Sequence, residues 1–329
     1  MTAPAGRTWT DEDVVALAQR LDNAGRWGPD DQLGTLNYIG PDQRIAAAGL
    51  VRSGITVSLA RPLEVDASLA ARVDLDHNVV HMNAADERFG TPPFAGEYIG
   101  LESHQPGVTH LDAVGHIGGF DGRIYGGRRF IDEVADDGLR FGSVYAQRSG
   151  IFSRGVLLDV PAALGVDWLE PEHEVTGADL GAAEQHAGVT VGTGDVVVLR
   201  VGIDARANIH GPSSTSPGPG PDAARWLHER EVALFASDSP EHITPMGARI
   251  LGRVAPDGPP PGGTPETRFP LVFHQLALPF IGLVLLDHAE VEGLARVCRE
   301  LARHEFLFVA APLPLPSGTG SPVNPLAIF

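Results

Sequence analysis

The chain has 329 residues, of which 43% are hydrophobic and 20% charged, a composition typical of folded globular proteins rather than disordered ones. Acidic residues outnumber basic ones 42 to 24, and a formal net charge of -18 disfavours nucleic acid and anionic membranes as partners, because both would be repelled. The single cysteine, Cys298, excludes an intrachain disulfide, and residues 1–13 lack the apolar core of a signal peptide, so we expect a cytoplasmic protein.

The first elements are two helices and a strand. Thr10 and Asp13 form a capping-box pattern ahead of an apolar face with helical spacing, which predicts the start of a helix. A second helix is expected over residues 41–54, because it opens with proline. Residues 55–59 alternate apolar and polar side chains, as a half-buried strand does. Residues 62–130 contain few periodic runs, so we expect loops and short strands there, wrapped over a site.

Predicted strands and helices alternate in the rest of the chain. Thr176 and Asp179 repeat the capping box and predict another helix. The Gly/Pro-rich residues 211–223 fit a domain linker or an active-site loop, and we favour the loop because a short helical pattern follows at once. Residues 276–286 are about half a membrane span long and are interpreted as a buried strand. Further strands are predicted at 155–160, 195–201, 271–278 and 306–310, and a helix at 291–302.

One cluster stands out among the 13 histidines, the segment SHQPGVTHLDAVGHIGG at 103–119. His110 and Asp112 are two positions apart, so on an extended strand their side chains project from the same face. His116 lies four positions beyond Asp112 and reaches the same place if the chain turns. Imidazole nitrogens and a carboxylate oxygen suit Zn²⁺, Mn²⁺ or Fe²⁺. The spacing favours a metal site, and leaves open a set of ordinary surface and core histidines.

Other candidate motifs are weaker. His77 and His81 have the i, i+4 spacing of a zinc pair, but no Glu follows His77, and we place His81 in the lining of a substrate pocket instead. Asp238 and Glu241 fit either a pair of carboxylates that support a metal ligand or a capped turn before Pro245. The glycines of residues 192–194 lack the third glycine of a dinucleotide fingerprint, and the sequence has no Gly-x-Ser-x-Gly elbow.

The motif THLDAVGH resembles the signature of the metal-dependent cyclase-like hydrolases, a family that includes kynurenine formamidases, isatin hydrolases and trans-dienelactone hydrolases. The longer-chain branch of this family is matched by WGPDDQLGTLN at 27–37, IYGG at 124–127, GDVVVLR at 194–200, SDSPE at 237–241 and FLFVAAPLPLPSGTGSPVNPLAIF at 306–329. The similarity covers nearly the whole chain in the right order. It implies one α/β domain over residues 1–329, of the swivelling β/β/α type, with a mixed, largely antiparallel sheet and flanking helices.

The resemblance also implies site residues. It maps the family's metal ligands and an adjacent catalytic histidine to His110, Asp112 and His116, and a later histidine and an acidic residue in a distant segment to His274 and Asp287. The implied cofactor is one divalent metal ion, Zn²⁺ or Mn²⁺. The neighbouring subunits of a homodimer or homotetramer would complete a pocket for a small-molecule substrate.

The sequence departs from the family at two positions. Pro106 stands where shorter members have a histidine, and His104, six positions before His110, is a candidate replacement ligand. Asp287 stands where Glu is usual, so its carboxylate is one methylene shorter and can act through a water molecule or from outside the ligand set. A single ion is therefore better supported than two.

These residues predict a metal-dependent hydrolase of a small cyclic amide or ester, or of an N-formyl aryl amine, in which a metal-activated water attacks a carbonyl. His116 is the first choice for the proton donor and His274 the second, with the roles exchanged if His116 is a ligand. One alternative is a metal-dependent cyclase or lyase acting on a natural-product intermediate. Another is a non-catalytic metal-binding protein.

Aromatic residues that could hold a flat substrate lie in the loop-rich half of the chain. Phe120 and Tyr125 follow the histidine motif directly and are expected in the substrate pocket. Trp27 is a further candidate, together with His81. All of them could equally pack under loops.

Overall fold

A nine-stranded mixed sheet forms the centre of the molecule in the computed structural model, which describes residues 9–63, 75–82, 94–250 and 268–329. Across the sheet the strands are β1 (Thr56–Ser58), β15 (Leu326–Ile328), β13 (Glu305–Ala310), β7 (Ile151–Asp159), β9 (Val196–Arg200), β11 (Leu234–Ser237), β12 (Val284–Asp287), β4 (His110–Asp112) and β14 (Gly320–Pro322). The three pairings from β7 to β12 are parallel, and those on both sides are antiparallel. The expected mixed, largely antiparallel sheet is thereby confirmed.

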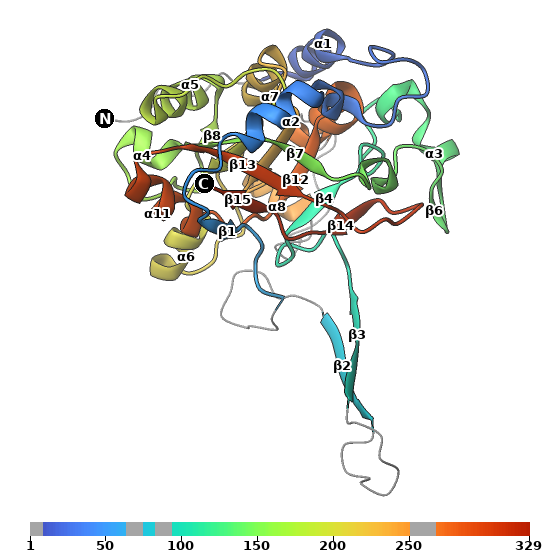
Figure 1. Ribbon diagram of the computed structural model, residues 1–329. Coiled ribbons are helices and arrows are strands. Elements are labelled where there is room, and N and C mark those ends of the chain that lie inside the picture. Colours follow the sequence, from blue (N-terminus) through green and yellow to red (C-terminus); the bar gives the residue numbers. More distant parts are fainter. Residues whose placement is uncertain (1–8, 64–74, 83–93, 251–267) are drawn as a thin grey trace, which may run out of the picture.

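The central strands are apolar because both of their faces are covered. All five residues of β9 are buried, as expected of a parallel strand between two layers. Its alternate residues Val197 and Leu199 belong to one core, and Val196 and Val198 to the other. The first core includes side chains of α1 (Asp11–Leu21), α5 (Gly177–Ala187) and α7 (Pro221–Glu229), and the second includes side chains of α11 (Glu292–Leu301). Figure 1 shows α1, α5 and α7 above the sheet.

The helix starts follow the sequence signals, but one helix end does not. Capping boxes of Thr10 with Asp13 and of Thr176 with Asp179 begin α1 and α5, as predicted. Helix α2 (Pro41–Ala48) ends well before Gly54, where the sequence analysis placed its end. The Gly49 amide turns back to carbonyls of the last helical turn and closes the helix there.

The remaining elements are short and connect the sheet to its surroundings. They are η1 (Gly34–Tyr38), η3 (Tyr125–Gly127), α3 (Phe130–Glu133), β5 (Val134–Ala135), β6 (Gly138–Leu139), η4 (Val144–Gln147), α4 (Val160–Leu164), β8 (Glu174–Val175), α6 (Ile203–His210), β10 (Gly218–Pro219) and α8 (Pro245–Ile250). Residues 211–223 contain β10, which pairs with β8, and Ser216 bridges to Ile243. A linker between separate domains would not make these pairings. None of the helices in the described residues could cross a lipid bilayer.

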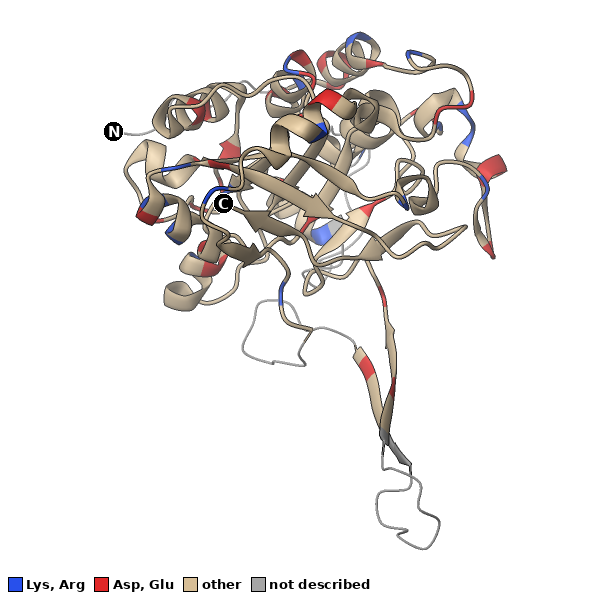
Figure 2. Ribbon diagram, viewed as in Figure 1, with Lys and Arg blue, Asp and Glu red and all other residues tan. Residues whose placement is uncertain are grey.

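Residues 62–130 contain longer strands than predicted. Strands β2 (Leu75–Met82) and β3 (Phe94–Leu101) pair along their whole length as an antiparallel ribbon. We call this ribbon the arm, because it projects away from the sheet and the helices (Figure 1). Figure 2 shows few charged positions along the arm.

The apolar residues 271–286 are mainly helical rather than extended. Residues Val272–Leu276 form the helix α10, and Ala277–Ile281 continue as the π-helical turn η5 before β12 begins at Val284. The strand predictions over 271–278 and 276–283 are therefore wrong. A short apolar run fits a buried helix as well as a buried strand, and here Gly282, with a φ of 68°, ends the helical turn.

The loop that carries WGPDDQLGTLN supports this helical turn. The Thr35 amide donates to the Gly282 carbonyl at 2.9 Å, and the Thr35 hydroxyl donates to the Ala233 carbonyl at 2.8 Å. A Cβ at Gly34 would lie 2.0 Å from the Gly282 carbonyl oxygen, so glycine is required for this approach. The motif thus holds the segment between His274 and Asp287 in place.

Candidate metal centre

Two strands place histidine and carboxylate side chains at one point. Strand β4 pairs with β12 antiparallel, and this register sets His110 opposite Asp287. Asp112 lies two positions after His110 on β4 and joins them on the same face, as the spacing predicted. His110, Asp112 and Asp287 are 2%, 1% and 6% exposed, so the three side chains meet in a buried space.

His104 completes a first group of donor atoms. His110 Nε2 lies 3.5 Å from Asp112 Oδ1, and His104 Nδ1 lies 3.0 Å from the same oxygen. The donor atoms of His104, His110 and Asp112 are all within 4.8 Å of one another, close enough to share a metal ion. The structure thus brings His104 to the place that the sequence analysis considered for it.

His274 contributes to a second group that shares Asp112. His274 Nε2 lies 3.0 Å from Asp287 Oδ2 and 3.8 Å from Asp112 Oδ2. His274 comes from α10, and Asp287 ends β12, one of the parallel strands whose carboxyl ends form a common edge of the sheet. These three residues also have donor atoms within 4.8 Å of one another.

In His104, His110 and His274, the outer ring nitrogen, which points away from Asp112 and Asp287, lies within hydrogen-bond distance of an oxygen atom. His110 Nδ1 donates to the Val108 carbonyl at 2.8 Å, and His274 Nδ1 donates to Glu241 Oε2 at 2.7 Å. His104 Nε2 lies 3.0 Å from the Thr319 hydroxyl. Metal-binding histidines are typically oriented in this way, with the outer nitrogen hydrogen-bonded and the inner nitrogen free for the ion. The donor set therefore fits a divalent metal ion.

The sequence allowed Glu241 and Asp238 to be either carboxylates that support a metal ligand or a capped turn before Pro245, and the structure gives them separate partners. Glu241 is 1% exposed, accepts from His274 Nδ1 and also accepts the Phe273 amide at 2.7 Å, so it supports the centre. Asp238 accepts the backbone amides of residues 201–203 at the start of α6, at 2.8–3.1 Å, and is a capping residue. Burial raises the pKa of Asp238 to about 6, against these hydrogen bonds.

Burial and neighbouring charges control the protonation of Asp112 and His116. Burial by itself would raise the pKa of Asp112, but the neighbouring His116, His104 and His110 outweigh it and lower the pKa below its usual range. Burial lowers the pKa of His116 to about 4, although Asp112 acts against this change. Asp112 is therefore ionised and His116 neutral at pH 7.

The pKa of His274 is shifted upwards, in contrast to the pKa values of Asp112 and His116. Burial would lower the pKa of His274, but the charges and hydrogen bonds of Asp287 and Glu241 raise it well above its usual value. In the metal-free chain His274 is therefore cationic and lies between two carboxylates.

His116 lies beside the centre but in neither group of donor atoms. Its ring stacks on His104, with 3.7 Å between ring centroids and an angle of 3° between ring planes. On sequence grounds His116 is a candidate both for a metal ligand and for the proton donor, and its role stays a prediction.

The three aromatic residues expected to bind substrate differ in their burial and packing. Tyr125 is 1% exposed, and its hydroxyl donates to Asp31 Oδ2 at 2.8 Å, so it is a core residue rather than a pocket residue. Trp27 packs edge-on against Tyr38 at 5.1 Å. Phe120 is half-buried and stacks on Phe280 at 5.1 Å.

The histidines of the arm are separate from the centre. His77 and His81 lie on β2, so their i, i+4 spacing is that of a strand and not of a zinc-binding helix. The exposed His77 pairs across the ribbon with Glu97 at 2.7 Å. The His81 side chain lies outside the described residues, so its predicted place in the substrate pocket stays a prediction.

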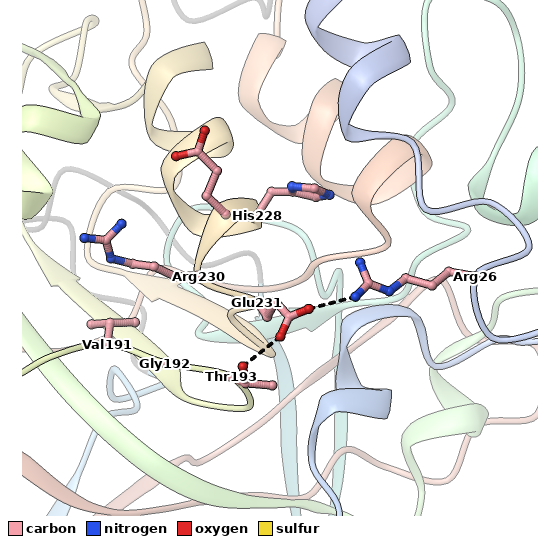
Figure 3. A pocket seen from close by; sticks show the side chains of 8 residues that line it. Arg26, Val191, Gly192, Thr193, His228, Arg230 and Glu231 are labelled. Atoms are coloured by element: carbon pink, nitrogen blue, oxygen red, sulfur yellow. Dashed lines mark hydrogen bonds and ion pairs between the residues drawn. The ribbon is translucent and has the colours of Figure 1, made fainter.

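A cavity of about 520 Å³ lies elsewhere on the molecule (Figure 3). It is lined by Arg26, residues 191–193 and residues 228–231, none of which belongs to the candidate metal centre. Glu231 pairs with Arg26 at 2.7 Å and accepts from the Thr193 hydroxyl at 2.7 Å. These polar groups bind one another, and we assign no ligand to this cavity.

The fold and the donor set define a mixed α/β protein with a buried histidine–carboxylate centre that can hold a divalent metal ion. The sequence pattern of the Cyclase family, described as "Putative cyclase", matches residues 45–242. The match covers more than half of the chain, and the chain therefore belongs to the Cyclase family. The resemblance first seen in THLDAVGH is confirmed.

Solved structures agree with this assignment. A crystal structure described as a novel cyclase is 27% identical, covers 94% of this chain and 99% of its own, and has a TM-score of 0.76. Isatin hydrolase A from Labrenzia aggregata, bound to benzyl benzoate, is 21% identical over 87% of this chain and 97% of its own, with a TM-score of 0.52. Isatin hydrolase A from Ralstonia solanacearum is 20% identical over 86% of this chain and 94% of its own, with a TM-score of 0.51. A comparison with curated proteins gave no match.

Proposed function

We propose that this chain is a metal-dependent hydrolase of a small cyclic amide or ester, or of an N-formyl aryl amine. The observation that carries the proposal is the orientation of three histidines, His104, His110 and His274. Their inner nitrogens face Asp112 and Asp287, while their outer nitrogens are held by oxygen atoms. Imidazoles held in this way, beside carboxylate side chains, form a donor set for Zn²⁺ or Mn²⁺.

A divalent ion bound here supplies Lewis acidity and lowers the pKa of a bound water towards about 7. The chain contributes the rigid placement of the donor atoms and their exclusion from bulk water. We assign one ion, because Asp112 belongs to both donor groups and cannot be counted twice without a bridging arrangement.

We assign proton transfer to His116 and a ligand role to His274. His116, with a pKa of about 4, is neutral at pH 7 and can accept a proton from the attacking water. It can then return this proton to the leaving nitrogen or oxygen. His274 has Nδ1 committed to Glu241 and Nε2 beside Asp287, which suits a ligand better than a proton carrier.

The first substrate to test is isatin, a cyclic amide, because two proteins of similar fold are named isatin hydrolases. A simple lactone and N-formylaniline test the ester and formamide alternatives. Fold similarity alone does not fix the substrate, so all three belong in the first screen.

The test combines metal content and turnover in the wild type, Asp112→Ala and His116→Gln. We expect about one equivalent of zinc or manganese in the wild type, as the proposed single site requires. Asp112→Ala should lose both metal and turnover. His116→Gln should keep the metal while kcat falls by about 10²–10⁴-fold. A wild type that stays metal-free after incubation with either ion would refute the proposal.

A second candidate is a metal-dependent cyclase or lyase acting on a natural-product intermediate. The structure with a TM-score of 0.76 is described as a cyclase, which favours this candidate. A dedicated cyclase would bind metal but would not hydrolyse lactones, cyclic amides or formanilides. Metal binding without turnover of any compound in the screen would count against the hydrolase, and would leave the cyclase or lyase and the non-catalytic metal-binding protein as the alternatives.

We also propose that the chain forms a homodimer or homotetramer through the arm. Val79, Tyr98 and Ile99 are 51%, 59% and 51% exposed on a two-stranded ribbon. Such a ribbon is only marginally stable in water by itself, and burial of these side chains against a second copy would stabilise it. Light scattering should give two or four times the mass of one chain, reduced in Val79→Ser/Ile99→Ser. A monomeric wild type would contradict this assembly.

A further inference from the structure

The backbone next to Asp287 is held in an unfavourable conformation. His288, which follows Asp287 at the end of β12, has a φ of 55°. A non-glycine residue keeps such a conformation only when its surroundings hold it there. Two donors do so at its carbonyl: the Thr109 hydroxyl at 2.7 Å and Arg61 Nε at 3.0 Å.

Thr109 stands where the β4–β12 ladder stops. The ladder joins Leu286 to Leu111 and Asp287 to His110, so the next residues in register would be His288 and Thr109. His288 cannot continue the strand with a positive φ, and the Thr109 side chain contacts its carbonyl instead of the backbone.

Arg61 contacts Thr109 as well as the His288 carbonyl. Its backbone amide donates to the Thr109 hydroxyl at 2.9 Å, and its guanidinium pairs with Asp204 of α6 at 2.8 Å. Thr109 is 3% exposed and the Arg61 side chain 12%, so water competes little for these bonds. Three segments of the chain therefore meet at the His288 carbonyl oxygen, and α6 holds one of them through Asp204.

We propose that Thr109 and Arg61 are positioning residues for the metal centre. By holding the His288 carbonyl, they set the separation between Asp287 and His110, whose Oδ2 and Nε2 atoms are 4.0 Å apart. This inference rests on the proposed metal-dependent function, because it concerns the geometry of the same centre. Without the two bonds His288 can relax to an extended conformation, and this relaxation would displace the Asp287 carboxylate.

The test measures the affinity for Zn²⁺ and Mn²⁺ by competition with a chelator. Thr109→Val keeps the shape of the side chain but removes the hydroxyl, and should weaken binding by about 10–100-fold. Thr109→Ser keeps the hydroxyl and should restore the affinity. His288→Asn keeps the carbonyl and tolerates a positive φ, so it should also bind like the wild type. Circular dichroism of the metal-free variants controls for folding.

The outcomes separate this inference from the proposed function. A wild type that binds neither ion refutes both. A wild type that binds while Thr109→Val binds equally well refutes the positioning role alone, as does a Thr109→Ser variant as weak as Thr109→Val. If Thr109→Val does not fold, Arg61→Met, which removes the second donor to His288, must show the same loss of affinity.

Discussion

Glu241 Oε2 lies 2.7 Å from His274 Nδ1, although the two residues are 33 positions apart in the sequence and both side chains are buried. The same carboxylate accepts the amides of Phe273 and His274, at 2.7 and 3.4 Å. Glu241 therefore holds both the ring of His274 and the start of the helix that carries it. The inner nitrogen of the ring is thereby directed at Asp287.

The first prediction concerns this pair. Glu241→Gln keeps the size of the side chain but removes its charge, and we expect the affinity for Zn²⁺ or Mn²⁺ to fall by about 10–100-fold. Chelator competition measures the effect. Asp238→Asn is the matched control, because Asp238 is an equally buried carboxylate that caps α6, and it should keep the affinity. Equal affinities of Glu241→Gln and the wild type would contradict the supporting role of Glu241.

Metal binding should release a proton from His274. The pKa of His274 in the metal-free chain is raised well above its usual value, so the ring is protonated at pH 7 and must lose the proton to bind an ion. We therefore expect the affinity to increase with pH, by up to about tenfold per unit below the pKa. Titration calorimetry in buffers of different ionisation enthalpy measures the released proton. An affinity that does not change with pH would exclude His274 as a ligand.

Gly320 provides the space for His104. A Cβ at Gly320 would lie 2.5 Å from His104 Cε1 and 2.7 Å from the Leu111 carbonyl oxygen. Gly320→Ala should therefore displace the imidazole and lower the metal affinity. Gly192→Ala is the control, since a Cβ there meets nothing within 4 Å. If Gly320→Ala binds metal like the wild type, then His104 does not contribute to the centre.

Gly34 should be essential for stability. Its φ is 56° and an added Cβ would lie 2.0 Å from the Gly282 carbonyl oxygen, so Gly34→Ala should lower the free energy of unfolding by about 3 kcal/mol. Gly25→Ala, at a φ of 77° with open space around the Cβ, should cost about 1 kcal/mol. Urea denaturation measures both. Similar losses for the two variants would show that backbone strain, and not the contact with Gly282, dominates.

Cys298 should be unreactive in the folded chain. It is 0% exposed on α11, and burial raises the pKa of its thiol to about 12, so almost no thiolate is present at pH 8. We expect no reaction with a disulfide reagent in native buffer and one reacting thiol after denaturation. Rapid reaction of the native protein would show that α11 opens.

Local sequence was sufficient for features that depend on neighbouring residues. The capping boxes at Thr10 and Thr176 begin helices where predicted, because a cap needs only side chains three positions apart. His110 and Asp112 share a face because successive strand residues alternate in direction. The resemblance added the family and the mixed sheet, which no local pattern specifies.

Packing between distant segments accounts for the rest. Residues 272–281 have the apolar composition of a buried strand but are helical, and the turn at Gly282 that ends them is packed against Gly34, Thr35 and Tyr125. Tyr125 packs against the same turn in the core, and its hydroxyl donates a hydrogen bond to Asp31. The partners of His104 and His274, Thr319 and Glu241, are 215 and 33 positions away from them. Periodicity describes only the residues of one element, so it carries no information about contacts that form when separate elements are brought together by burial of their apolar faces.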